Sequence, residues 1–118
     1  MQNVLELTKK EFESSSTKTP EYLAWHKTFK KEFTAFLKQK GATKIEISKS
    51  NHFDISGFFK IGMQIFWFRI EDLRWNKEDM LIRTATNFND YTGGYNRYIS
   101  LDNYEIFLTQ FNEIIFSL

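Results

Sequence analysis

The chain has 118 residues, which suits one domain, residues 1–118, that is large enough to bury a core. Aromatic residues make up 18% of it, and a single proline and five glycines accompany them, a composition that argues against disorder. There is no cysteine, which excludes disulfides, thiolate metal sites and thiol nucleophiles. The formal net charge is +1, whereas proteins that bind polyanions along a uniform surface are usually far more basic.

The two halves of the chain differ in charge. Residues 1–60 carry 11 Lys/Arg and 7 Asp/Glu, and residues 61–118 carry 5 and 8, so the first half is mildly basic and the second mildly acidic. The first residues lack the basic and apolar regions of a signal peptide, and no apolar stretch approaches the roughly 20 residues that a spanning helix needs. We therefore expect a soluble, cytoplasmic protein without a membrane partner.

Helical patterns dominate the first part of the chain. Residues 1–18 form an N-terminal segment in which 4–13 favour a short helix. The main helix is expected over 19–41, with Thr19 as N-cap, Pro20 at the first helical position and Gly41 as the C-terminal cap. Its apolar residues recur every three or four positions and form one stripe: Tyr22, Trp25, Phe29, Phe33, Phe36 and Leu37.

Residues 42–101 have the patterns of four or five strands. The segment 42–48 alternates apolar and polar residues, and 52–70 contains two β-prone runs around a break at 60–62, where Gly62 suits the positive φ of a tight turn. Further strands are expected at 80–86 and 97–101, on either side of a polar and aromatic loop. Because the links between them are too short for parallel crossovers, we predict an antiparallel meander.

A second long helix is expected over 102–118, with Asp102 as N-cap and Glu105 completing a capping box. Helices before and after such a meander usually pack on one face of it. The predicted fold class is therefore α+β in two layers, with the N-terminal and C-terminal helices on the same face of the sheet.

One set of polar residues suggests catalysis, because His52, Asp54 and Ser56 share a face of the first hairpin arm. Residues two apart on a strand lie about 6–7 Å apart at Cα, and the set lacks the turn that exposes a nucleophile. A metal site would need a third ligand. We therefore predict no catalytic residue, no metal site and no cofactor, and keep an enzyme using His52 and Asp54 as an alternative.

A stronger signal is spread over the face of the predicted sheet that lies opposite Phe66, Phe68 and Ile70. Trp, Tyr and Arg are enriched at protein interfaces, and aromatics interleaved with arginines on an open sheet also bind single-stranded nucleic acid. The N-terminal segment could also cover this face and leave it without a role. The predicted partner-binding residues are Trp67, Arg69, Arg83, Tyr91, Tyr95, Arg97 and Tyr98. A second candidate is the basic face of the main helix, Lys27, Lys30, Lys31 and Lys38, whose alternative is an ordinary solvated helix face.

Several runs also carry a resemblance to other proteins. They are FDISGFF at 53–59, WFRIEDLRW at 67–75, MLIRTA at 80–85 and DYTGG at 90–94. Together they resemble small uncharacterised proteins of phages and other mobile elements of low-GC bacteria, a set that includes inhibitors of host defence of the anti-CRISPR type. The resemblance implies binding to a nuclease complex without catalysis, and it supplies no site residues.

The leading hypothesis is thus a small non-enzymatic protein that occludes or bridges a macromolecular partner, a protein or nucleoprotein complex. The alternative of direct single-stranded nucleic-acid binding predicts an affinity that falls steeply with salt. A homodimer through Ile65 and Trp67 would be compatible with either hypothesis.

Overall fold

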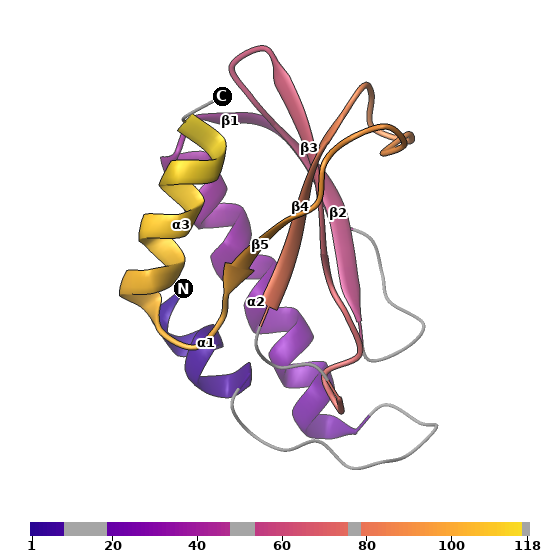
Figure 1. The fold of residues 1–118 in the computed structure, drawn as a ribbon. Helices are drawn as coiled ribbons and strands as arrows, with labels where there is room; N and C mark the ends of the chain where they lie inside the picture. Colours follow the sequence, from indigo (N-terminus) through magenta and orange to yellow (C-terminus); the bar gives the residue numbers. More distant parts are fainter. Residues whose placement is uncertain (9–18, 48–53, 76–78, 117–118) are drawn as a thin grey trace.

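Five strands pair in the order of the sequence, each antiparallel to its neighbours, in a computed structural model that describes residues 1–8, 19–47, 54–75 and 79–116 (Figure 1). The strands are β1 (Ala42–Ile47), β2 (Ile55–Ile61), β3 (Gln64–Ile70), β4 (Asp79–Ala85) and β5 (Arg97–Ser100). This topology confirms the predicted meander, with five strands.

In the described part of the chain, three helices complete the fold: α1 (Gln2–Thr8), α2 (Pro20–Gln39) and α3 (Tyr104–Phe116). Figure 1 shows all three on the same side of the sheet, with α2 running behind α1 and α3. The two-layer α+β architecture predicted from the sequence is therefore confirmed. None of the described helices is both long enough and apolar enough to cross a membrane.

The start of α2 forms as predicted, whereas its C-cap is Lys40, one residue before the predicted Gly41. The Thr19 hydroxyl accepts a hydrogen bond from the amide of Tyr22 at 3.1 Å, and Pro20 begins the helix. At the other end Gly41 has a φ of 98°, a left-handed conformation that glycine adopts without steric cost. The chain can therefore turn directly from α2 into β1.

The ends of the other two helices differ from the prediction. The segment expected to be helical at 4–13 forms α1 from Gln2 to Thr8, and residues 9–18 lie outside the described part of the chain. Asp102 is not the N-cap of α3: the Asn103 side chain accepts the hydrogen bond from the Ile106 amide at 2.8 Å. Asp and Asn are both common N-cap residues, so the sequence pattern did not distinguish Asp102 from its neighbour Asn103.

The hairpin between β2 and β3 turns slightly later than predicted. Ile61 pairs with Gln64, so the turn residues are Gly62, with a φ of 60°, and Met63. Met63 lies in the turn and is exposed. The two-residue loop has its only positive φ at the glycine, as the hairpin geometry favours.

Aromatic rings join the two layers. Phe33 of α2 makes edge-on contacts with Phe59 and Phe68 of the sheet, with interplanar angles of 88° and 74°. Phe36 makes similar contacts with Phe107 and Phe111 of α3. Each edge-to-face pair contributes about 0.5–1.5 kcal/mol beyond the area it buries. Since α2 makes such pairs with both the sheet and α3, it connects the two.

Candidate partner-binding face

The register of the strands places the side chains of the outer face, the sheet face opposite the helices, in rows that cross the strands, and two neighbouring rows contain the predicted residues. One row contains Glu46, Phe58, Trp67 and Arg83, and the next contains Ser56, Arg69, Leu81 and Tyr98. Phe66, Phe68 and Ile70 are buried on the other side, against the helices. The sequence therefore assigned the two faces of β3 correctly.

The central residue of the outer face is covered by the chain itself. Tyr91, from the loop after β4, stacks on Trp67 with ring centroids 4.1 Å apart and an interplanar angle of 11°. Trp67 is only 8% exposed as a result, whereas Tyr91 is 42% exposed. Trp67 therefore packs beneath Tyr91, and the ring of Tyr91 is the one exposed to solvent.

The loop after β4 spans residues 86–96 (Figure 1). Phe88 from this loop also packs on the outer face. The ring of Phe88 lies 5.9 Å from that of Phe58 between centroids, and the Nζ of Lys44 lies 4.2 Å from the centroid of Phe88. A cation over an aromatic face is attracted by the ring quadrupole. Contacts from β1 and β2 thus hold the loop against the sheet.

Arg83 fixes the loop to β4. Its Nε donates to the Asn96 Oδ1 at 2.8 Å, and its NH1 group donates to the carbonyl oxygen of Tyr91 at 3.1 Å. Gly94 passes so close to β4 that an added Cβ would lie 2.3 Å from the carbonyl oxygen of Thr84. A side chain at position 94 would therefore push the loop away from the strand.

The tip of the loop is closed by Asp90, whose Oδ1 accepts hydrogen bonds from the Thr92 hydroxyl at 2.6 Å and the Thr92 amide at 3.0 Å. Hydrogen bonds to a carboxylate favour its charged form, so these two lower the pKa of Asp90, the hydroxyl contributing most. Gly93 follows with a φ of 82°, which suits glycine.

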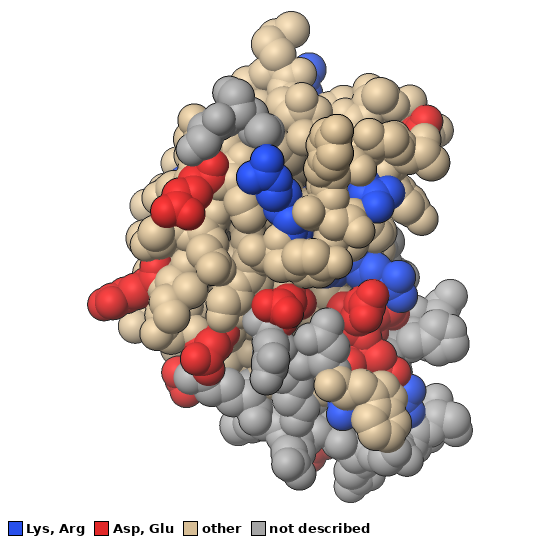
Figure 2. Space-filling view, in the orientation of Figure 1, with Lys and Arg blue, Asp and Glu red and all other residues tan. Residues whose placement is uncertain are grey.

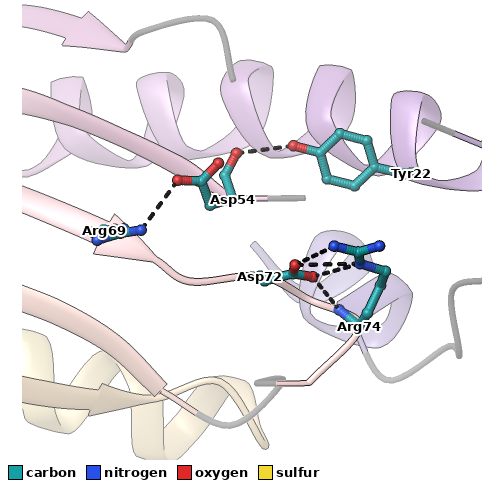
Figure 3. Close-up of polar contacts among 5 residues, drawn as sticks. All are labelled: Tyr22, Asp54, Arg69, Asp72 and Arg74. Carbon is teal, nitrogen blue, oxygen red and sulfur yellow. Dashed lines mark hydrogen bonds and ion pairs between the residues drawn. The ribbon is translucent and has the colours of Figure 1, made fainter. Parts of the chain in front are cut away.

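Two arginine–carboxylate pairs lie at the other end of the sheet (Figure 3). Arg69 reaches Asp54 with an N···O distance of 3.5 Å, and the backbone oxygen of Asp54 accepts a hydrogen bond from the Tyr22 hydroxyl at 2.9 Å. Arg74 binds Asp72 more closely, at 2.6 Å, and this hydrogen bonding raises the pKa of Arg74. The Tyr22 bond ties α2 to the chain entering β2.

The structure brings five of the seven predicted partner-binding residues together on the outer face: Trp67, Arg69, Arg83, Tyr91 and Tyr98. Tyr98 is 57% exposed and lies across from Leu81. Arg97 pairs with the inward-facing Ile82, so it lies on the helix side of β5. Tyr95 lines a pocket with Arg97 on that side, apart from the other five.

The predicted basic residues lie in the other layer. Lys27, Lys30, Lys31 and Lys38 are all exposed on α2. Although α2 packs on the inner face of the sheet, Lys30 lines a pocket together with Glu46, Phe58 and Trp67 of the outer face. Figure 2 shows basic and acidic residues interleaved over the strands rather than a continuous basic area.

The alternative catalytic set is only partly described. His52 lies outside the described residues, and Asp54 pairs with Arg69. Within the described ranges, no three His, Asp or Glu side chains are grouped so that they could hold a metal ion. The structure thus adds no geometry to the hypothesis of an enzyme using His52 and Asp54.

The sequence analysis did not identify the residues that hold the loop 86–96 and the outer face together. Phe58 and Phe88 pack together there, and Asn96 holds the guanidinium of Arg83. The alternation along β2 could have placed Phe58 on this face, because it lies between the inward-facing Gly57 and Phe59. Asn96 gives no such signal, since its partner depends on how the loop folds back.

Comparison with known proteins adds no relative: no protein-family model matches the chain, and no curated protein and no solved structure is significantly similar to it.

Proposed function

We propose that the protein is a small non-enzymatic binding protein that recognises a protein partner through its outer face. The observation that carries the proposal is that two exposed rings, Tyr91 and Tyr98, share one face of the sheet with Arg69. Tyrosine and arginine dominate the energetics of many protein interfaces. Few residues are needed for such a site if they are held in place before binding.

The supporting contacts argue for such preorganisation. Tyr91 rests on the buried indole of Trp67, and its backbone oxygen is held by Arg83. Tyrosine has few rotatable bonds, so a stacked tyrosine loses little conformational entropy when a partner covers it. The loop would therefore present a fixed aromatic contact rather than a mobile one.

Charge favours a protein partner over a nucleic acid. The outer face carries carboxylates as well as arginines: Glu46 lies across from Phe58, Asp54 beside Arg69, and Asp79 on the same side of β4 as Leu81. Phosphate chains are bound by surfaces that neutralise them with Lys and Arg. Mixed charge suits a partner surface that is itself mixed, and it provides specificity.

The resemblance noted in the sequence makes a host nuclease complex the first partner to test, with inhibition by occlusion as the expected mode of action. Tagged protein is used to capture partners from host lysate with and without nuclease treatment, and the captured proteins are identified by mass spectrometry. We expect a defined protein that is retained after nuclease treatment. Capture that disappears with nuclease would instead indicate nucleic-acid binding.

Matched variants make the test specific to this face. Tyr98→Ala and Arg69→Ala remove exposed outer-face side chains and should each weaken capture at least tenfold if they are hot-spot residues. Leu23→Ala is the control, because Leu23 is an exposed apolar residue on α2 in the other layer. If both outer-face variants capture the partner as well as wild type, the binding surface lies elsewhere.

A further inference from the structure

A pocket of about 130 Å³ lies on the helix side of the sheet, between β3, β4, β5 and α3. Its lining residues, among those described, are Phe66, Ile82, Thr84, Tyr95, Arg97 and Ile114. Phe66 and Ile82 are buried and form its floor, whereas Tyr95 and Arg97 are exposed and lie at its mouth. The pocket is therefore apolar inside and polar where it opens.

Two contacts hold the elements around the pocket in place. Gly94 lies against the carbonyl oxygen of Thr84, so the chain leading into β5 runs close beside β4 and carries Tyr95 to the rim. Outside the pocket, Gln110 of α3 accepts a hydrogen bond from the Ser100 amide at 2.6 Å. This bond fixes α3 to β5, so the pocket is formed before any ligand binds.

The charge at the mouth is unusual for this molecule. Arg69 and Arg74 each pair with a carboxylate, and Arg83 is hydrogen-bonded within the loop. Arg97 has no ion pair or hydrogen bond to its side chain among the described residues, and no acidic residue of the described part lines the pocket. Its guanidinium is therefore free to bind an anion beside an apolar cavity.

We propose that this pocket binds a small apolar molecule that carries one carboxylate, of the size of benzoate. Apolar cavities of about 150 Å³ accommodate a benzene ring, and the volume here is close to that. The ring would lie between Phe66, Ile82 and Ile114, and the carboxylate would meet the guanidinium of Arg97, whose paired donors match the two carboxylate oxygens. The site is independent of the outer face.

The test uses the full chain labelled with ¹³C at isoleucine δ1 methyl groups, titrated with benzoate and followed by NMR. Ile82 and Ile114 line the pocket and should shift, whereas Ile55, buried in β2 away from the pocket, should not. Benzyl alcohol and benzylammonium have the same ring with a neutral and a cationic group. We expect the affinity to fall in the order benzoate, benzyl alcohol, benzylammonium.

Variants separate the charge from the cavity. Arg97→Gln should weaken benzoate binding by about tenfold or more, since hydrogen bonds to charged groups are the stronger ones, and should leave benzyl alcohol binding unchanged. Arg69→Gln, on the other face, is the control and should change neither. Equal benzoate affinity in wild type and Arg97→Gln would overturn the proposal, as would shifts at Ile55 equal to those at Ile82.

Discussion

Tyr91 covers the indole of Trp67 although Trp67 lies in the middle of a strand and Tyr91 in a loop beyond the next strand. Without this stack, the indole of Trp67 would be exposed on the open sheet. Tyr91 covers the indole and presents its own ring and hydroxyl at the surface. Exposed apolar patches promote unspecific association, and a tyrosine placed over a tryptophan reduces that risk while it keeps an aromatic contact at the surface. This relationship leads to the first prediction.

Tyr91→Ala should expose Trp67 without unfolding the protein. We expect a red shift of tryptophan emission and a loss of about 0.5–1.5 kcal/mol of unfolding free energy beyond the loss due to buried area. The measurement is fluorescence during urea unfolding, in a Trp75→Phe background because Trp75 is already exposed. Tyr95→Ala is the control: Tyr95 is 83% exposed and should leave the emission unchanged. An unshifted spectrum in Tyr91→Ala would contradict the stacked arrangement.

The second prediction concerns Arg83, which was expected from the sequence to contact a partner directly. Its hydrogen bonds to Asn96 and to the Tyr91 carbonyl show that it also organises the loop. Arg83→Met keeps the length of the side chain and removes both bonds, so the loop amides at 87–96 should lose hydrogen-exchange protection. Each such bond contributes about 0.5–1.5 kcal/mol, so the loop should open while the sheet stays folded.

Arg97→Met is the matched control for this experiment, because Arg97 lies outside the hydrogen bonds of the loop. Exchange in the loop should remain as in wild type in that variant. Arg83→Lys distinguishes charge from geometry: a lysine has one ammonium group and cannot present the two donors in the same fork. Protection restored fully by lysine would mean that charge, not the paired hydrogen bonds, holds the loop.

Most of the fold was predictable because local patterns and the global fold agree. The apolar stripe of α2, the cap at Thr19 and the turn glycine Gly62 each act within a few residues, and each signal was read correctly. The alternation in β3 also gave the correct inner face. Agreement between local preference and overall topology is what makes a sequence readable in this way.

The candidate site was less predictable because its contacts join distant segments. The residue types of the site were identified, but Trp67 could not be known to lie under Tyr91, since that depends on the path of the loop. Arg97 and Tyr98 are neighbours in sequence and were grouped together, yet strand alternation places them on opposite faces. For this reason Arg97 lies at the helix-side pocket, whereas Tyr98 lies on the outer face.

The third prediction tests the start of α3. Asn103 accepts the hydrogen bond from the Ile106 amide, so Asn103→Ala should lower the unfolding free energy by about 0.5–2 kcal/mol. Asp102→Ala should have a smaller effect, because the Asp102 side chain is exposed and is not the cap. Urea denaturation of both variants, compared with wild type, gives the two values. A larger loss in Asp102→Ala would restore the capping box that the sequence suggested.

The fourth prediction is a pH dependence within the loop. The hydrogen bonds from Thr92 lower the pKa of Asp90, so they favour the folded loop when the carboxyl group is ionised. This stabilisation is present above the unfolded-state pKa and is lost as the pH falls through the lower, folded-state pKa. Loop amides should therefore begin to lose exchange protection only in the acid range, below the ordinary pKa of an aspartate.

The carboxyl pKa of Asp90 can be measured directly by NMR titration in wild type and in variants of its partner. Thr92→Val removes the hydroxyl and should raise the pKa toward its ordinary value, whereas Thr92→Ser keeps a hydroxyl and should leave it low. The amide of residue 92 remains in both variants, so the rise in Thr92→Val should be incomplete. Thr109→Val, an exposed position on α3, is the control and should not change it. If Thr92→Val titrates like wild type, the hydroxyl is not the main cause of the low pKa, and the loop tip is held by the backbone amide instead.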